Sequence, residues 1–501
     1  MSIRHLLNII ALLLVFISIA MAATGAGALF YEDGAAPALF ASAGITLLVG
    51  TVTYAFTKFE KGEQLTAREG YAIVTLAWTS LAVFGALPFL LSGTLDGVVP
   101  AIFESMSGFT TTGATVFSDV ESLPEGILLW RSVTHWIGGM GIIVLAIAIL
   151  PYVGVGGMQL FRAEVPGPTP ERLRPRITQT AKLLWSVYVG LTGVQILLYL
   201  FGGMSLFDAV NHAFATLATG GFSTRNASIA GFDSAYIHYV TIIFMYIAGV
   251  NFALHFRAAT GHLEYFRDEE WRFYTMVVVG AGLFLMVSHL MAGSYGLSAA
   301  GMEHALRDGM FQAVAITTTT GFVSADFEVW TPAAQGLLVA LMFVGGMAGS
   351  TGGGIKAVRV LVLLRHTASE IRKHLHPRAI LMVRVGKHSV REEVLLNILG
   401  FVSLYVLLVL FGGMLLTFFG MDILTAVGAS AASVGNIGPG LGGVGATDNY
   451  GWITNPGLIV ITFLMLVGRL EIYTVLLLFH PDTWKRQQAK TSEARVVRPR
   501  K

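Results

Sequence analysis

The chain has 501 residues, of which 54% are hydrophobic and only 12% are charged. A typical soluble protein is about 25% charged, so this sequence supplies too little polar surface for a water-soluble fold. These values favour a polytopic membrane protein and argue against a cytosolic enzyme, a disordered chain or a nucleic-acid binder. The net charge is +2 and there is no cysteine, which excludes disulfides, iron–sulfur clusters and thiol catalysis.

Ten stretches are long and apolar enough to cross a bilayer, since a spanning helix needs roughly 20 mostly apolar residues. They are predicted at 6–30, 38–57, 71–92, 128–150, 183–203, 235–256, 273–293, 333–364, 394–419 and 452–479. The eighth stretch is interrupted by glycines. We expect the first to be a retained helix and not a signal peptide, because its apolar run exceeds a usual signal core.

Positive charge is divided unevenly between the two sides of these spans. Lys and Arg gather at the N-terminal end, in loops 58–68, 162–182 and 257–272, in segment 356–391 and in the tail from Lys485. The exceptions are Arg131, Arg225, Arg307 and Arg469. Because cytoplasmic connections carry such an excess, the sequence predicts a multi-pass protein with both termini in the cytoplasm.

A shorter apolar stretch, ending in a glycine turn, recurs in four of the outside connections. The stretches cover about 100–112, 207–219, 304–319 and 423–434, and none is long enough to span a bilayer. The turns contain Thr111-Thr112-Gly113, Thr219-Gly220-Gly221, Thr319-Thr320-Gly321 and Val434-Gly435-Asn436. One motif that recurs roughly every hundred residues indicates repeated structural units. Each unit is predicted to be a span, a half-helix, a turn and a second span.

Turns of this kind suit the passage of a dehydrated cation. A half-helix that enters the bilayer leaves backbone carbonyls unpaired, which is tolerated only where they line a water-filled path. Four turns around one axis would form rings of carbonyl oxygens that replace the water shell of a monovalent cation. Glycine permits the backbone angles that this arrangement needs. One such turn alone would be interpreted as an ordinary helix end, whereas four in register favour a pore.

With these four turns, the Gly-rich interruption at 345–354 and Arg469, the sequence resembles the superfamily of Trk, Ktr and HKT potassium transporters, and within it the bacterial TrkH type. The resemblance implies an all-α polytopic membrane protein with four pseudo-repeats of span, pore loop and span around one ion pore, plus two extra N-terminal spans. The expected divisions are the extra spans at 1–60, repeats at 70–152, 181–257, 272–366 and 390–480, and a basic cytoplasmic tail at 481–501.

The resemblance also implies a function, which is potassium uptake across a bacterial inner membrane by a protein that is not an enzyme. Potassium would be the substrate, and no cofactor is expected in this chain. The implied partners are a second copy in a homodimer, a cytoplasmic nucleotide-binding ring of RCK domains of the TrkA type, and the lipid bilayer, with no nucleic acid. In the family a glycine in the first turn accompanies potassium selectivity, and here that residue is Gly113.

Two of the turns have more than one possible alignment with Gly113. In the second turn the equivalent residue is either Gly220 or Gly221, and in the fourth it is either Gly435 or Asn436. The spacing G-x-G-x-x-G at 438–443 resembles a dinucleotide-binding fingerprint, but neither a preceding strand nor a βαβ unit is plausible there. We therefore assign no role to that segment.

Residues 345–356 should unwind the eighth span, because each interior glycine costs a helix about 0.8–1 kcal/mol relative to alanine. We interpret this segment as a movable loop that obstructs the pore, although the glycines could instead allow close helix packing. The predicted gate consists of Gly345, Gly346, Gly349, Gly352, Gly353, Gly354, Lys356 and Arg469.

Charged residues accompany this predicted gate. Arg469 is expected well inside the last span, where a charge normally faces protein or water. The resemblance places it in the cavity below the turns as a barrier to cations, and a buried ion pair with another helix is the alternative. Lys356 and Arg359 could reach the cytoplasmic headgroups or take part in gating. A secondary transporter that couples potassium to sodium or protons remains a second interpretation, since such proteins place polar ligands on broken helices.

Overall fold

The protein is all-α apart from one small hairpin, in the part of the chain that the computed structural model describes. That part comprises residues 3–57, 67–153, 177–378, 381–386 and 388–481. The hairpin pairs β1 (Arg384–Val385) with β2 (His388–Ser389) in antiparallel register. The all-α prediction is confirmed. The predicted basic tail, except Pro481, and most of loops 58–68 and 162–182 lie outside the described residues.

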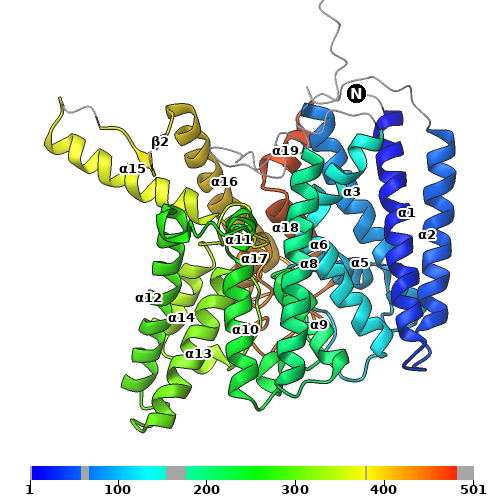
Figure 1. Ribbon diagram of the computed structural model, residues 1–501, viewed down its shortest axis with the longest axis horizontal. Helices are drawn as coiled ribbons and strands as arrows, with labels where there is room; N and C mark the ends of the chain where they lie inside the picture. The colour runs from blue at the N-terminus through cyan, green and yellow to red at the C-terminus, as the bar shows by residue number, and fades with distance from the viewer. Residues whose placement is uncertain (1–2, 58–66, 154–176, 379–380, 387, 482–501) are drawn as a thin grey trace, which may run out of the picture.

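Two N-terminal helices, α1 (Ile3–Ala28) and α2 (Ala36–Phe56), form an antiparallel pair at one flank of the molecule (Figure 1). The pair packs on the rest of the protein through α1, against α3 (Ala67–Gly85) and α6 (Glu125–Val153), and through α2, against α4 (Leu87–Leu91). At Gly50 the two helices come so close that a Cβ atom would lie 3.1 Å from the Ala11 carbonyl oxygen. Helices in a bilayer associate through close contacts of small residues, because burying apolar side chains adds little to the free energy of association there.

The remaining helices follow one another in the order of the four units that the sequence predicts. A first long helix precedes a short buried helix, and a second helix follows it. In the first unit these are α3 with α4 (Leu87–Leu91), then α5 (Val98–Phe109) and α6. The second contains α8 (Ile177–Phe201), α9 (Leu206–Leu217), α10 (Ala235–Ala248) and α11 (Phe252–Ala259). The third contains α12 (Glu269–Met291), α13 (Ala299–Thr317), α14 (Pro332–Leu341) and α15 (Ala357–Leu375). The fourth contains α16 (Glu392–Thr417), α17 (Ile423–Gly435), α18 (Asn455–Arg469) and α19 (Tyr473–Phe479).

The short helices α5, α9, α13 and α17 are fixed at their N-terminal ends by capping residues or turns in the connections. Ser205, Ser298 and Asp422 each accept a hydrogen bond from a backbone N–H in the first turn of α9, α13 and α17. Such caps satisfy N–H groups that have no partner inside the helix. Three single turns of 3-10 helix lie in other connections: η1 (Ser228–Gly231), η2 (Tyr265–Arg267) and η3 (Phe327–Val329).

The second helix of every unit is interrupted, whereas the sequence predicted an interruption in the third unit alone. Helices α10 and α11 meet at 103°, and α18 and α19 meet at 118°. Helix α6 contains Gly141 in a non-helical conformation. The sequence predicted spans at 128–150, 235–256 and 452–479 without their interruptions. The reason is that the apolar composition continues through each bend, so hydropathy cannot detect it.

The interruption in the fourth unit changes the position of Arg469. The residue ends α18, and Glu471 and Ile472 follow it with positive φ angles of 58° and 46°. Arg469 therefore lies inside the predicted last span, at the bend between α18 and α19. In the third unit the predicted interruption is present, as an irregular segment over residues 342–356 between α14 and α15.

Replacing Gly50 with isoleucine should weaken the α1–α2 contact, because the new side chain would meet the Ala11 carbonyl and the side chains of Leu14 and Val15. Overpacking of this kind costs about 1–3 kcal/mol. The effect is measured as a lower midpoint of thermal unfolding in detergent. Gly44→Ile on the same helix is the control, because nothing lies within 4 Å of its Cβ position. Equal melting of the two variants would contradict the close contact.

Candidate functional site

The four short helices end in turns that share one backbone conformation. Each turn starts with a residue of positive φ between 52° and 59°. These residues are Thr111, Thr219, Thr319 and Asn436. In every turn the next N–H group donates to the carbonyl five residues earlier, at 2.8 or 2.9 Å. The donors are Thr112, Gly220, Thr320 and Ile437. This is the Schellman closure of a helix, and it makes the four turns equivalent although only three start with threonine.

The third residue of each turn is a glycine with positive φ. These glycines are Gly113, Gly221, Gly321 and Gly438. The second turn therefore aligns through Gly221. In the fourth turn the equivalent residue is Gly438, while Val434 and Gly435 belong to α17. The prediction of these two as turn residues was wrong. In the other turns a threonine shows where the turn begins, and the fourth turn contains no threonine. The pattern Asn436-x-Gly438 could have revealed the register, since asparagine tolerates the left-handed conformation.

The turns form a closed ring, in which each glycine faces the carbonyl oxygen of the residue before the next glycine. A Cβ atom at Gly113 would lie 2.0 Å from the Gly220 oxygen, and one at Gly221 would lie 2.1 Å from the Thr320 oxygen. A Cβ atom at Gly321 would lie 1.7 Å from the Ile437 oxygen, and one at Gly438 would lie 2.7 Å from the Thr112 oxygen. No side chain fits between neighbouring turns. Four main-chain carbonyls are therefore brought together around one centre.

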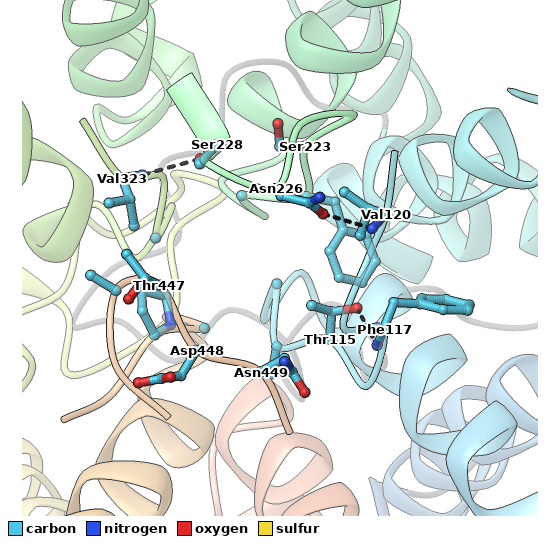
Figure 2. Close-up of a pocket in the computed structure, with 18 of the residues that line it drawn as sticks. Thr115, Phe117, Val120, Ser223, Asn226, Ser228, Val323, Thr447, Asp448 and Asn449 are labelled. Atoms are coloured by element: carbon cyan, nitrogen blue, oxygen red, sulfur yellow. Dashed lines mark hydrogen bonds between the residues drawn. The ribbon is translucent and has the colours of Figure 1, made fainter. Parts of the chain in front are cut away.

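The outer connections close a second ring around the same centre, through hydrogen bonds at each boundary between neighbouring units; Figure 2 shows those at the first two boundaries. These bonds join Asn226 Oδ1 to Val120 N at 2.7 Å, Ser228 Oγ to Val323 N at 3.2 Å, Glu328 Oε1 to Gly442 N at 2.7 Å, and Thr115 O to Tyr450 N at 2.8 Å. Burial raises the pKa of the Glu328 carboxyl, against the opposite effect of the Gly442 N–H group. Neighbouring units are thus in contact both at the turn glycines and at the outer connections.

Side chains of the turns brace the backbone. The hydroxyls of Thr110 and Thr112 hydrogen-bond at 2.8 Å, and those of Thr318 and Thr320 at 2.7 Å. In the fourth turn Asn436, the equivalent of Thr111, donates to Thr112 Oγ1 of the first turn at 3.0 Å. The threonines therefore hold the turns in shape, and the oxygens that face the neighbouring turns belong to the main chain.

One cavity adjoins the ring and a second lies at the Gly-rich segment. The outer cavity, of about 130 Å³, is lined by the turn glycines and by the segments that follow them, with Thr115, Ser223 and Asp448 among the polar residues (Figure 2). The second, of about 80 Å³, is lined by residues 350–354 of the Gly-rich segment, by α6 around Gly141 and by the end of α18 around Arg469. The turn glycines thus line one cavity and the Gly-rich loop lines the other.

The Gly-rich loop, residues 342–356, presses against the inner side of the ring. Its Gly353 N–H donates to Thr319 Oγ1 at 2.6 Å, and a Cβ at Gly353 would lie 2.5 Å from the Gly435 oxygen. Thr351 Oγ1 lies 3.0 Å from the Leu217 carbonyl at the end of α9. The loop contacts three of the short helices, and its glycines leave no room for side chains there.

The first turn of α12 anchors this loop from the other side. Glu270 Oε1 accepts hydrogen bonds from Ala348 N at 2.7 Å and from Val358 N at 3.1 Å. The neighbouring Glu269 accepts from Arg365 at 2.6 Å and from Gly386 N in the hairpin at 2.9 Å. Sequence reasoning missed both residues, and a pair of acids at the start of an apolar span is the signal that could have found them.

Arg469 ties the loop to α6. Its guanidinium donates to the Thr351 carbonyl at 2.9 Å and to the Gly138 carbonyl at 2.9 Å. Arg359 forms a largely buried ion pair with Glu471 at 2.5 Å, and Lys356 Nζ donates to the Gly352 carbonyl. The expectation that Lys356 and Arg359 reach the headgroups was wrong, because both find partners inside the protein.

Acidic residues behind three of the turns also escaped the sequence analysis. Each lies on a short helix and binds a hydroxyl in the segment after the turn. The pairs are Glu104 with Thr115 at 3.0 Å, Asp208 with Thr224 at 2.6 Å, and Asp308 with Ser324 at 3.2 Å. A carboxylate seven or eleven residues before the threonine that starts the turn is the spacing that could have identified them.

Comparison with known proteins points to one family. Residues 36–486 match the family described as TrkH, cation transport protein. Over 97% of its length the chain is 42% identical to the Trk system potassium uptake protein TrkH of Halomonas elongata and 40% identical to that of Escherichia coli, covering all of both relatives. The crystal structure of the potassium transporter TrkH from Vibrio parahaemolyticus matches with a TM-score of 0.87 at 39% identity, covering 97% of this chain and all of the other.

The register of the fourth turn can be tested with two alanine substitutions. Gly438→Ala should destabilise the protein by about 1–3 kcal/mol, because its φ of 101° strains any other residue and the Thr112 oxygen is close. Gly435→Ala is the control, since its Cβ would meet the flexible end of the Ile437 side chain. Thermal unfolding in detergent measures both. A larger loss of stability for Gly435→Ala than for Gly438→Ala would contradict the alignment.

Proposed function

This chain belongs to the TrkH family of cation transport proteins, and on that premise we propose that it takes up potassium across a bacterial inner membrane through a channel-like pore. The observation that carries the proposal is the closed ring of four glycine turns. Each turn glycine faces a neighbouring carbonyl oxygen too closely to admit a side chain. Rings of backbone carbonyls are the means by which channels replace the hydration shell of potassium.

The proposed selectivity filter consists of main-chain oxygens from the turns. Its residues are Thr111, Thr112, Gly113, Thr219, Gly220, Gly221, Thr319, Thr320, Gly321, Asn436, Ile437 and Gly438. The C-terminal ends of the four short helices lie at these turns, and a helix carries partial negative charge at that end. The arrangement favours a monovalent cation stripped of water, because neutral oxygens offer less to a divalent ion.

The proposed gate is the Gly-rich loop below this filter, with Gly345, Gly346, Gly349, Gly352, Gly353, Gly354, Lys356 and Arg469. The contacts of the loop with the Thr319 hydroxyl and with the guanidinium of Arg469 support a closed position. In that position the positive charge of Arg469 would also oppose the passage of a cation. Movement of the loop away from the ring would open the path.

The proposed regulatory partner is a cytoplasmic nucleotide-binding ring of RCK domains of the TrkA type, which would itself bind the nucleotide. Helix α15 and the hairpin project from the helix array at the end where α19 lies (Figure 1). This region carries the basic residues of segment 356–391 and faces the side that the charge distribution predicts to be cytoplasmic. Lipid phosphates could bind the same charges. A homodimer is also proposed, on the resemblance.

A secondary transporter that couples potassium to sodium or protons is the alternative function. The interrupted second helices favour it, because coupled transporters place their binding sites on broken helices. Recording reversal potentials while sodium and pH are varied would separate the two. A reversal potential that follows the potassium gradient alone supports the channel-like pore, whereas a dependence on the sodium or proton gradient supports coupling.

Replacing Gly113 with serine should lower potassium-over-sodium selectivity. The serine Cβ would lie 2.0 Å from the Gly220 oxygen at a φ of 82°, so the ring must widen. In the family, serine at this position goes with sodium preference. We expect the permeability ratio to fall on the order of tenfold, equivalent to ~1.4 kcal/mol. Cation flux into liposomes measures it, and equal sodium and potassium fluxes in both proteins would refute the filter assignment.

Replacing Arg469 with alanine should raise potassium flux, because it removes a positive charge from the path and frees the loop from α6. The expected rise is roughly threefold to tenfold, in line with a charge term of about 1 kcal/mol. Flux is measured in liposomes without any partner protein. Arg267→Ala, at an exposed arginine in η2, is the matched control. Unaltered uptake by Arg469→Ala would remove the barrier role.

A further inference from the structure

We propose that the buried ion pair between Glu104 and Arg131 is a positioning element for cation selectivity, which holds the first and second turns in register and neutralises a charge beside the outer cavity. This inference rests on the proposed function, since it presupposes that the turns select among cations. Glu104 lies on α5, and Arg131 lies on α6 and lines the outer cavity.

The pair is buried more deeply than the other ion pairs of the described residues. Arg131 Nε and Glu104 Oε1 lie 2.8 Å apart, and the two side chains are 2% and 0% exposed. Burying two charges is expensive, and a well-packed apolar pair is often at least as stable. Stability alone therefore gives little reason for this pair, and its contacts point to a second role.

These contacts reach the segments that leave two neighbouring turns. Glu104 accepts from Thr115 Oγ1 at 3.0 Å and from Val116 N at 2.9 Å. Arg131 donates to the Ser223 carbonyl at 3.3 Å and to Thr115 Oγ1 at 3.2 Å. Thr115 and Ser223 each lie two residues beyond a turn glycine. One ion pair thus fixes equivalent points in the first and second units.

Arg131 also clamps the residue after the second turn glycine. Its guanidinium carbon lies 4.0 Å from the centroid of the Phe222 ring. The ring of His135, one helical turn further along α6, stacks on Phe222 at 4.0 Å with an interplanar angle of 17°. Phe222 is held between a cation and an aromatic ring, which leaves Gly221 little freedom to change the direction of its carbonyl.

The second and third units hold their turns differently. Asp208 and Asp308 accept from the hydroxyls of Thr224 and Ser324. The arginine beside Asp208 is Arg225, whose side chain is 43% exposed. Among the described residues, the first unit is therefore the one in which the carboxylate behind the turn pairs with a buried arginine. This ion pair is the brace of the first unit. Selectivity should depend on this brace more than on the others.

Removing either residue of the pair leaves the other charge unpaired, and the two changes should have opposite effects on an approaching cation. Without Glu104, the positive charge of Arg131 would remain beside the outer cavity and repel an approaching cation. Without Arg131, a buried carboxylate would remain and attract one. Both changes release Thr115, so both should loosen the ring, but only the first should also lower the total cation flux.

The test is a double-mutant cycle with reconstituted full-length protein in liposomes, using reversal potentials in potassium and sodium gradients and potassium flux at fixed voltage. We expect Glu104→Gln and Arg131→Met each to lower the potassium-over-sodium permeability ratio on the order of tenfold. We expect Glu104→Gln also to lower flux, and Arg131→Met to preserve or raise it. In the double variant the loss of selectivity should be smaller than the product of the single losses.

Glu264→Gln, which breaks the part-exposed pair with Arg257 in the connection between α11 and α12, is the matched control and should retain the wild-type ratio. Where a neutral variant does not fold, Arg131→Lys keeps the charge but loses the forked contacts to Ser223 and Thr115, and should lower the ratio without lowering flux. Wild-type selectivity in folded single variants, or single losses that multiply in the double variant, would overturn the inference. A wild-type protein that conducts no potassium would instead defeat the proposed function.

Discussion

The structure depends on the close approach of each turn glycine to a carbonyl oxygen of the neighbouring turn. Four segments that lie far apart in the sequence meet at distances that leave no room for a Cβ atom. Because the contact is cyclic, running from the first turn through the second, third and fourth and back to Thr112, a shift in one turn disturbs both neighbours. The outer ring of hydrogen bonds, such as that from Val120 N to Asn226, supports the same closure.

The interrupted second helices follow from the demands of that ring. The break in α6 at Gly141 and the bend after α18 border the space of the inner cavity. The Gly-rich loop occupies this space, and Arg469 can reach it because the residue lies at the end of a helix. The same backbone breaks therefore create the inner cavity and place the loop across it.

The parts of the site are connected to the rest of the protein by carboxylates. Glu270 holds the loop while the adjacent Glu269 holds α15 and the hairpin, so the predicted cytoplasmic side and the loop share one helical turn. Glu104 acts on the outer side, where it joins two turns through Arg131. The four units are alike in their backbone and different in these side chains, which is where regulation and selectivity would be specific to one unit.

The sequence by itself determined the membrane class, the all-α fold and the Gly-rich interruption, because hydropathy and glycine content act locally along the chain. It also identified three of the four turns, from threonine and glycine in adjacent positions. Only the tertiary structure decided the fourth turn at Gly438, the bends in apolar helices, and the partners of Arg469, Glu270 and Glu104. Each of these depends on contacts between segments distant in sequence, which a local pattern such as Asn436-x-Gly438 can suggest but cannot establish.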